Sequence, residues 1–239
     1  MSPKLPVAFK RSAIAILVTT GLLMLLPLVV GSFSLHVLTI AFYYVILAAS
    51  WNLLAGYMGQ FSLAHHAFAA VGAYTSGLLG YHWGISFWVG IPAGVVLSAA
   101  MGWGLGRLVL RMRAIYLAIA TWAFAETVHI YLTADYKFTR GELGLSVKPL
   151  FGSVDPLPYY FTFLGLTALI LLFLRAIIDS PLGYFMRAIK DDELRARSLG
   201  IDATRVKVAV FAISSAIAGL AGGVYGHYVV LLSPQMVDF

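Results

Sequence analysis

The sequence predicts an all-α fold, a polytopic bundle of about seven membrane-spanning helices. Of the 239 residues, 61% are hydrophobic and only 11% are charged, whereas an ordinary soluble domain has roughly 25% charged residues. No Asp, Glu, Lys or Arg occurs from Ser12 to Gly106. The apolar runs are continuous and do not alternate with a period of two, which excludes an outer-membrane barrel.

This composition also excludes several classes of function. The uncharged stretch has room for about four spans of ~20 residues each, and no water-soluble fold covers such a stretch with polar surface. A soluble enzyme, a nucleic-acid-binding protein and a disordered chain are therefore excluded, despite the net charge of +6. The sequence has no cysteine, so we expect no disulfide and no thiolate metal site.

Apolar runs and the turn residues between them define the spans in order. The first run is longer than the apolar core of a signal peptide and no small-residue cleavage site follows it, so we expect it to be retained. The third is short and rich in glycine and polar residues, which leaves open a full span or a broken, re-entrant segment. The seven spans cover residues 12–31, 37–56, 61–80, 86–106, 114–133, 158–178 and 206–231.

Three clusters of basic residues indicate the orientation of the bundle. Seven spans place all three clusters at the same end, and Lys and Arg that flank spans gather on the cytoplasmic side. The N-terminus is therefore expected in the cytoplasm. The clusters are Lys4, Lys10 and Arg11; Arg107, Arg111 and Arg113; and Arg175, Arg187, Lys190, Arg195, Arg197, Arg205 and Lys207.

The segment Trp51–Thr75 concentrates hydrogen-bonding side chains at membrane depth. Such groups are costly there unless they bond within the bundle or line a cavity, so interhelical hydrogen bonding and a translocation pathway are both open. A metal site at the adjacent histidines 65 and 66 is not expected, because neighbouring residues on a helix point about 100° apart. The candidate pathway residues are Asn52, Gln60, Ser62, His65, Tyr74 and Thr75.

Glu126 is the one acidic residue predicted inside a span. An intramembrane carboxylate is a functional candidate by default, and we add it to the candidate pathway. His129 lies one turn further along the same face. The pair is open to two interpretations, a packing role near the outer interface or a proton relay.

The loop Asp179–Lys207 combines an apolar stripe with mixed charge. Ser180 is a candidate N-cap before Pro181, and Gly200 is a plausible helix stop. One interpretation is a helix on the membrane surface. However, its acidic residues would be repelled by an anionic leaflet, so docking onto another protein is favoured. The stripe consists of Leu182, Phe185, Met186 and Ile189.

The stretch GYMGQFSLAHHAFAAVGAYT resembles a motif of the inner-membrane permeases of branched-chain amino acid ABC importers, in the branch with the longer outer loop. Three further blocks agree in order: YLAIATWAFAE, FTRGELGLS, and RAIKDDELRARSLGID followed by TRVKVAVFAISSAIAGLAGGVYG. The resemblance runs from about Leu35 to Pro234. It implies one permease domain over residues 1–239 in the bacterial inner membrane, which moves branched-chain amino acids or a related solute such as urea or an amide.

The resemblance also implies partners. The importer would be completed by a second permease, two cytoplasmic ATPases and a periplasmic binding protein. The permeases would lie in the lipid bilayer, and no nucleic acid is involved. This chain lacks the phosphate-loop pattern G-x-x-x-x-G-K-[ST]. The resemblance therefore implies that the chain is not an enzyme and binds no cofactor of its own, while the partner ATPases bind ATP and Mg²⁺.

Residues 180–204 would form the cytoplasmic coupling loop, with DELRARSLG in the place of the family's E-A-A…G motif. The match is loose, because Leu194 and Arg195 replace the small pair. The residues that the resemblance assigns to ATPase coupling are Arg187, Asp192, Glu193, Arg195, Ala196 and Gly200.

Family members continue past the Ser233–Pro234 motif into further helices, so a chain that ends at Phe239 is expected to be truncated or partial. Small residues at helical spacing in the last span favour close packing with another helix. We expect this stripe to face lipid as an unfilled interface, and the chain to be unable to transport alone. The stripe is Ala212, Ala216, Gly219, Gly223 and Gly226.

Two readings outside the importer class stay open. A secondary transporter that moves protons through Glu126 and His129 predicts transport that survives ATP depletion and collapses with the proton gradient. A membrane assembly factor predicts no flux with any partner.

Overall fold

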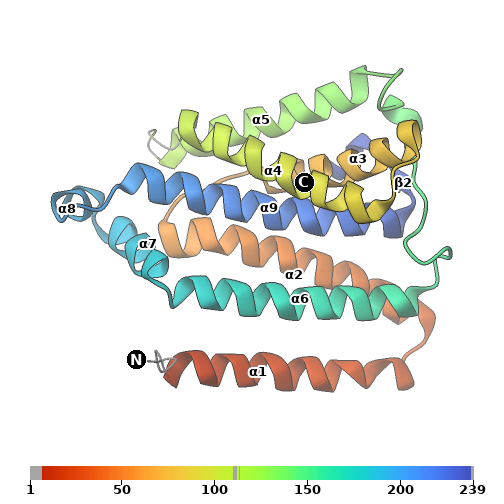
Figure 1. The fold of residues 1–239 in the computed structure, drawn as a ribbon, viewed down its shortest axis with the longest axis horizontal. Coiled ribbons are helices and arrows are strands. Elements are labelled where there is room, and N and C mark those ends of the chain that lie inside the picture. The colour runs from red at the N-terminus through yellow and green to blue at the C-terminus, as the bar shows by residue number, and fades with distance from the viewer. Residues whose placement is uncertain (1–6, 110–111, 113, 238–239) are drawn as a thin grey trace.

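Long helices that lie side by side along one direction make up the computed structural model, which describes residues 7–109, 112 and 114–237 (Figure 1). The helices are α1 (Val7–Met24), α2 (Ser32–Met58), α3 (His65–Trp83), α4 (Phe87–Val109), α5 (Ala114–Ala134), α6 (Pro156–Ile178), α7 (Pro181–Asp191), α8 (Glu193–Ser198) and α9 (Ala203–Val229). The short elements are η1 (Leu26–Leu28), η2 (Gly141–Leu143), β1 (Leu145–Ser146), β2 (Leu231–Leu232) and η3 (Pro234–Val237).

Within the described residues, six helices are long and apolar enough to cross a membrane by length and composition. They are Arg11–Leu28, α2, α4, α5, α6 and α9. The predicted third span is not among them. Residues 59–64 are not helical, and α3 runs without a break from His65 to Trp83, so the predicted span over residues 61–80 begins at His65 instead. Twelve of the 19 residues of α3 are buried, so other helices of this chain enclose it.

The two ends of the bundle differ in what they carry. The starts of α1 and α5, the end of α4, and helices α7 and α8 lie at the same end (left in Figure 1). This is the arrangement that the basic clusters predicted, although Lys4, Arg111 and Arg113 lie outside the described residues. At the opposite end β1 pairs antiparallel with β2, with Leu145 opposite Leu232.

Helix α9 is the most buried of the six candidate spans and packs mainly against α3 and α4. Glycines allow this approach: a Cβ on Gly94 would come within 2.6 Å of the Gly72 carbonyl oxygen, and one on Gly219 within 2.6 Å of Ser98 Cβ. The prediction that the small-residue stripe of α9 is an unfilled interface is therefore wrong. Helices α3 and α4 of this same chain fill it.

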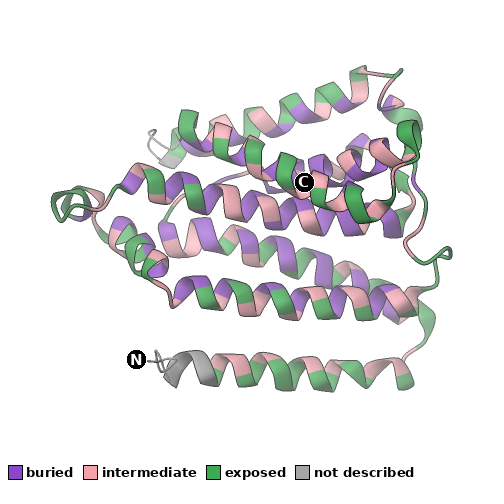
Figure 2. Ribbon diagram, viewed as in Figure 1, coloured by how far each residue is buried: buried purple, intermediate pink, exposed green. Residues whose placement is uncertain are grey.

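Helix α1 is the most peripheral span. No residue of its window Arg11–Leu28 is buried, and Figure 2 shows it without buried positions beside α6. A hydrogen bond of 2.6 Å from the Tyr160 hydroxyl to the Leu23 carbonyl attaches its C-terminal end. This helix contributes nothing to the cavity described below.

Candidate functional site

The chain unwinds between α2 and α3, inside the bundle. Helix α2 ends at Met58 because Gly59 takes the left-handed conformation, with φ of 69°, that glycine adopts without strain. The Gln60 amide still bonds to the Leu54 carbonyl at 3.0 Å. Residues 59–64 then run without regular structure until α3 begins at His65.

Other parts of the bundle satisfy the backbone of this unwound segment. The Trp51 indole donates to the Ser62 carbonyl at 2.8 Å, and the Leu63 amide donates to the Thr121 hydroxyl of α5 at 3.0 Å. Irregular backbone at membrane depth is tolerated only where protein or a water-filled cavity surrounds it. The unwound segment therefore needs the surroundings that α2 and α5 provide.

A cavity of about 380 Å³ lies between α2 and the unwound segment. Its volume is in the range of small-molecule sites, which join a mostly apolar wall to a few polar groups. One face of α2 provides most of the apolar wall, and the polar groups lie on the other side. The lining residues are Tyr44, Leu47, Ala48, Trp51, Ser62, Leu63, His65 and His66.

His65 has one bonded and one free ring nitrogen. The Ser214 hydroxyl donates to the Ser50 carbonyl at 2.6 Å, so the 2.8 Å contact between His65 Nε2 and Ser214 Oγ requires Nε2 to be the donor. In the neutral ring Nδ1 is then an acceptor. Among the described residues, neither His65 Nδ1 nor Gln60 Oε1 has a hydrogen-bond partner, and both atoms are buried. One acceptor without a partner therefore belongs to His65, which lines the cavity, and the other to Gln60 in the unwound segment.

At the opposite side of the unwound segment, α7 contacts the end of α2. The Lys190 ammonium donates to the Gly56 carbonyl at 2.6 Å, in the last turn of α2. A cation suits this position because the carbonyl end of a helix carries partial negative charge. Arg187 attaches the same helix to the end of α6, since its guanidinium donates to the Ile178 carbonyl at 3.1 Å.

Helix α8 is held by an ion pair that we call the latch, formed by Glu193 and Lys207. Glu193 Oε2 lies 2.7 Å from the Lys207 ammonium, and its other oxygen lies 2.7 Å from Arg197. Lys207 is only 4% exposed. Burial favours the neutral carboxyl group, but the hydrogen bonds and charges of Lys207 and Arg197 outweigh it and lower the pKa of Glu193. The latch joins α8 to the start of α9.

Comparison with known proteins places these features in a family. Residues 33–239 match the family model described as the permease component of the branched-chain amino acid transport system. The chain belongs to this permease family. No solved structure matches it.

Several curated permeases are similar to this chain. It is 35% identical over 241 aligned positions to the high-affinity branched-chain amino acid transport system permease protein LivM of Salmonella typhimurium, covering 89% of this chain and 57% of LivM. The corresponding LivM of Escherichia coli K12 is 34% identical over the same shares. LivH of Escherichia coli K12 is 24% identical over 81% of this chain and 69% of LivH. The chain thus spans a little over half the length of the LivM proteins.

The permease bundle brings only part of the predicted pathway together. Ser62 and His65 line the cavity and Gln60 lies in the unwound segment, as described above. The Thr75 hydroxyl bonds within its own helix, to the Val71 carbonyl at 2.6 Å. Tyr74 is buried in α3 and its hydroxyl has no partner among the described residues. Neither residue lines the cavity.

Two other predicted pathway residues lie away from the cavity. Asn52 is exposed, with its amide lying over Gly56. Glu126 is exposed on α5. What the sequence reasoning missed is the α2 wall, although Tyr44, Leu47 and Ala48 share a helical face with Trp51. That spacing was visible, but an apolar face among apolar residues gave no signal of a cavity.

The loop between α6 and α9 differs from the predicted single helix. Helix α7 begins at Pro181 with Ser180 as its N-cap, as predicted. It ends at Asp191 because Asp192 caps a second helix, where its carboxylate accepts the amides of Leu194 and Arg195 at 3.0 and 3.1 Å. Gly200, with φ of 87°, follows the end of α8.

The apolar stripe predicted on this loop mostly faces the bundle. Met186 and Ile189 are buried, while Phe185 is exposed. Most of this stripe is therefore not available for contact with another protein. Ala196 is buried as well. The apolar residues that α8 and its end do expose are Leu194 and Leu199, 77% and 82% accessible.

Proposed function

We propose that this chain is the membrane-spanning permease subunit of an ATP-driven importer, and that it moves branched-chain amino acids across the bacterial inner membrane. The observation that carries this proposal is the unwound segment beside a cavity with unpaired acceptors. Membership of the permease family and the printed function of the LivM relatives support it. Residues 1–239 form a single permease domain in this account.

The cavity has the chemistry that such a solute requires. An ammonium group offers three donors and no acceptor, which complements the acceptors Gln60 Oε1 and His65 Nδ1 once the bundle opens toward them. The α2 wall offers apolar and aromatic surface to a branched side chain. Urea or a short amide would also find these acceptors but would leave that apolar wall without a partner.

The proposed importer needs further subunits. A second permease completes the pathway, a periplasmic binding protein delivers the solute, and two cytoplasmic ATPases bind ATP and Mg²⁺. We infer that the end of the bundle that carries α7 and α8 is cytoplasmic, because flanking Lys and Arg favour that side. The N-terminus is then cytoplasmic too.

The ATPase contact is assigned to residues 180–204. Asp192, Glu193 and Ala196 have internal partners and act by shaping the loop, whereas Arg195, 86% exposed, projects outward with Leu194 and Leu199. Exposed apolar side chains beside an arginine are typical of a protein interface. Arg187 and Gly200 lie at the two ends of this proposed ATPase-binding surface.

Lys190 connects this loop to the end of α2 and the start of the unwound segment. Its ammonium donates to the Gly56 carbonyl in the last turn of α2, and its stem lies close to Gly59, where a Cβ would come within 3.2 Å of Lys190 Cγ. A displacement of α7 by the ATPase would therefore pull on the start of the unwound segment. In this account ATP-driven closure of the partners changes the shape of the cavity through this contact.

The proposal is tested by purification from membranes followed by uptake in liposomes. We expect an ATPase, a second permease and a binding protein to copurify, and the reconstituted complex to take up leucine only with ATP. Uptake by the chain alone under a proton gradient would overturn the proposal in favour of proton coupling. The exposed position of Glu126, outside the cavity, argues against that mechanism.

A further inference from the structure

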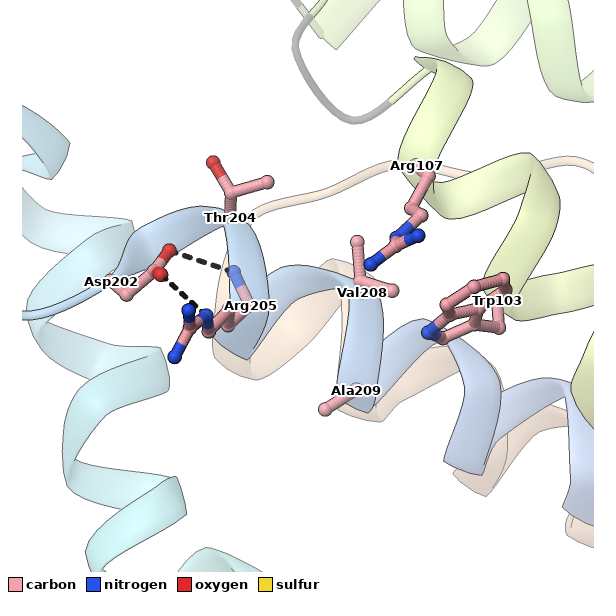
Figure 3. A pocket seen from close by; sticks show the side chains of 7 residues that line it. All are labelled: Trp103, Arg107, Asp202, Thr204, Arg205, Val208 and Ala209. Atoms are coloured by element: carbon pink, nitrogen blue, oxygen red, sulfur yellow. Dashed lines mark hydrogen bonds and ion pairs between the residues drawn. The ribbon is translucent and has the colours of Figure 1, made fainter.

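A second cavity of about 510 Å³ lies between the end of α4 and the start of α9. Figure 3 shows that Trp103 and Arg107 reach into it from α4, while Asp202, Thr204, Arg205, Val208 and Ala209 border it from the start of α9 and the turn before it. None of these residues lines the cavity beside the unwound segment. The proposed transport mechanism makes no use of this groove.

The charges in the groove are not neutralised within the described residues. Arg107 lies over the Trp103 ring, 4.0 Å from its centroid, and forms no ion pair with a described residue. Arg205 pairs through Nε with Asp202 at 2.9 Å, and the other Asp202 oxygen accepts the Arg205 backbone amide at 3.0 Å. The groove therefore contains two arginines and one carboxylate, with which Arg205 alone pairs among the described residues, and its net charge is positive.

The position of the groove selects its occupant. Both helices are membrane spans, Arg107 lies in the last turn of α4, and Arg205 in the first turn of α9. Trp103 is half-exposed one turn deeper along α4, at the level where tryptophan anchors to the lipid interface. A ligand here meets guanidinium groups at the end of the bundle and apolar surface further along the helices. This arrangement matches the headgroup and acyl chain of a phospholipid.

We propose that this groove binds the phosphate headgroup of an anionic phospholipid, with an acyl chain along Trp103, Val208 and Ala209. Guanidinium groups recognise phosphate oxygens through paired N–H donors, and basic pockets between spans at the cytoplasmic face are typical of such lipids. The biological meaning rests on the proposed orientation, which places the groove in the anionic cytoplasmic leaflet. Binding itself does not depend on that orientation.

The test measures lipid retention by native mass spectrometry of the purified chain from mixed phosphatidylglycerol and phosphatidylcholine. We expect preferential retention of phosphatidylglycerol. Arg107→Gln and Arg205→Gln should each weaken it about fivefold, because a basic residue near an anionic surface contributes ~1 kcal/mol. Arg107→Lys should retain phosphatidylglycerol less than the wild type and more than Arg107→Gln, since lysine keeps the charge but lacks the planar guanidinium group.

Arg195→Gln is the matched control. Arg195 pairs with the helix-capping Asp192 three residues earlier, as Arg205 does with Asp202, but it does not line this groove. Equal losses in Arg195→Gln and Arg205→Gln would overturn the site. Competition by glycerol 3-phosphate as strong as by phosphatidylglycerol would assign the groove to a soluble phosphate. If Arg107→Gln weakened binding of the purified ATPase and left lipid retention unchanged, the groove would be a protein interface instead.

Discussion

Two regions of this bundle place glycine and polar groups at membrane depth, and they use them in opposite ways. Where α3, α4 and α9 meet, glycines let backbones touch, and Ser98 donates to the Phe68 carbonyl at 3.1 Å. At the unwound segment and the start of α3, Gln60 Oε1 and His65 Nδ1 are buried acceptors without partners among the described residues, and His65 lines a cavity. The two regions differ in their use of polar groups: the Ser98 hydroxyl has a partner and stabilises the fold, whereas Gln60 Oε1 and His65 Nδ1 have none among the described residues and are the acceptors that we propose for the solute.

The largest expected effect comes from a substitution where α3, α4 and α9 meet. In Gly222→Leu the new Cβ would lie within 2.6 Å of Ala69 Cα. Because the obstacle is backbone, the cost should exceed the ~1–3 kcal/mol of an ordinary overpacked core. We expect the assembled protein to be lost, measured as monodisperse yield in detergent. Gly165→Leu is the control, since no atom lies within 4 Å of that Cβ. Equal yields would show that α3 and α9 are not in contact.

In the unwound segment we expect a substitution to lower transport without lowering the amount of assembled protein. Gln60→Leu removes one acceptor for the solute, and a hydrogen bond to a charged group contributes ~1.5 kcal/mol, or about tenfold in uptake. Leucine uptake per amount of assembled complex is the measurement. Thr75→Val is the control, because its hydroxyl bonds only within α3. Parallel losses of uptake and yield in Gln60→Leu would make Gln60 structural.

The latch gives an intermediate effect, on stability. Glu193→Gln leaves the buried Lys207 ammonium without its anion. We expect ~2 kcal/mol of destabilisation, below the usual range for a broken buried pair because Glu193 is 37% exposed. The double substitution with Lys207→Met should recover most of this loss. Thermal unfolding of the two single variants and the double variant measures the coupling, and additive losses would mean that the latch does not form.

The latch should also be insensitive to pH near neutrality. Because the folded state lowers the pKa of Glu193, its contribution is complete above the ordinary glutamate value of about 4.3. It is lost as pH falls through the lower folded value. We expect the difference in unfolding temperature between wild type and Glu193→Gln to stay constant from pH 8 to 5. A difference that disappears between pH 7 and 5 would contradict this assignment.

The smallest expected effect on the permease itself is at the docking surface. Leu194→Ser together with Leu199→Ser changes two exposed side chains, so unfolding should stay unchanged. ATPase binding should weaken severalfold, because apolar contact area at the interface is lost. Surface-captured permease with ATPase in solution provides the measurement. Unchanged ATPase affinity would place the contact elsewhere on the loop.

Hydropathy was sufficient to predict the spans but not their interruption. The predicted span over residues 158–178 corresponds to α6 (Pro156–Ile178), and that over 206–231 to α9 (Ala203–Val229). The predicted helix over 61–80 starts at His65 instead, because the contacts of Ser62 with Trp51 and of Leu63 with Thr121 hold the preceding residues unwound. Those contacts join residues that are distant in sequence or on different helices, so no local pattern reports them.

The sequence also did not predict which residues of the chain contact the small residues of α9 or pair with the charged ones. The spacing of Gly219 and Gly223 predicted close packing, but not that Gly72 and Gly94 of the same chain would provide it. Glu193 was expected at an ATPase contact, and only the fold places Lys207 beside it. Residue type indicated the kind of interaction, while the choice of neighbour depended on tertiary structure.

The central claim is that the solute passes through the cavity beside the unwound segment. The chain has no cysteine, so Leu63→Cys places a single thiol in the cavity lining, and Val154→Cys places one in the exposed loop before α6 as control. The measurement is the rate of labelling by a water-soluble thiosulfonate in the assembled transporter during ATP turnover, with and without leucine. We predict that leucine slows labelling of Leu63→Cys severalfold and leaves Val154→Cys unchanged. Labelling of Leu63→Cys that is indifferent to leucine would contradict the central claim.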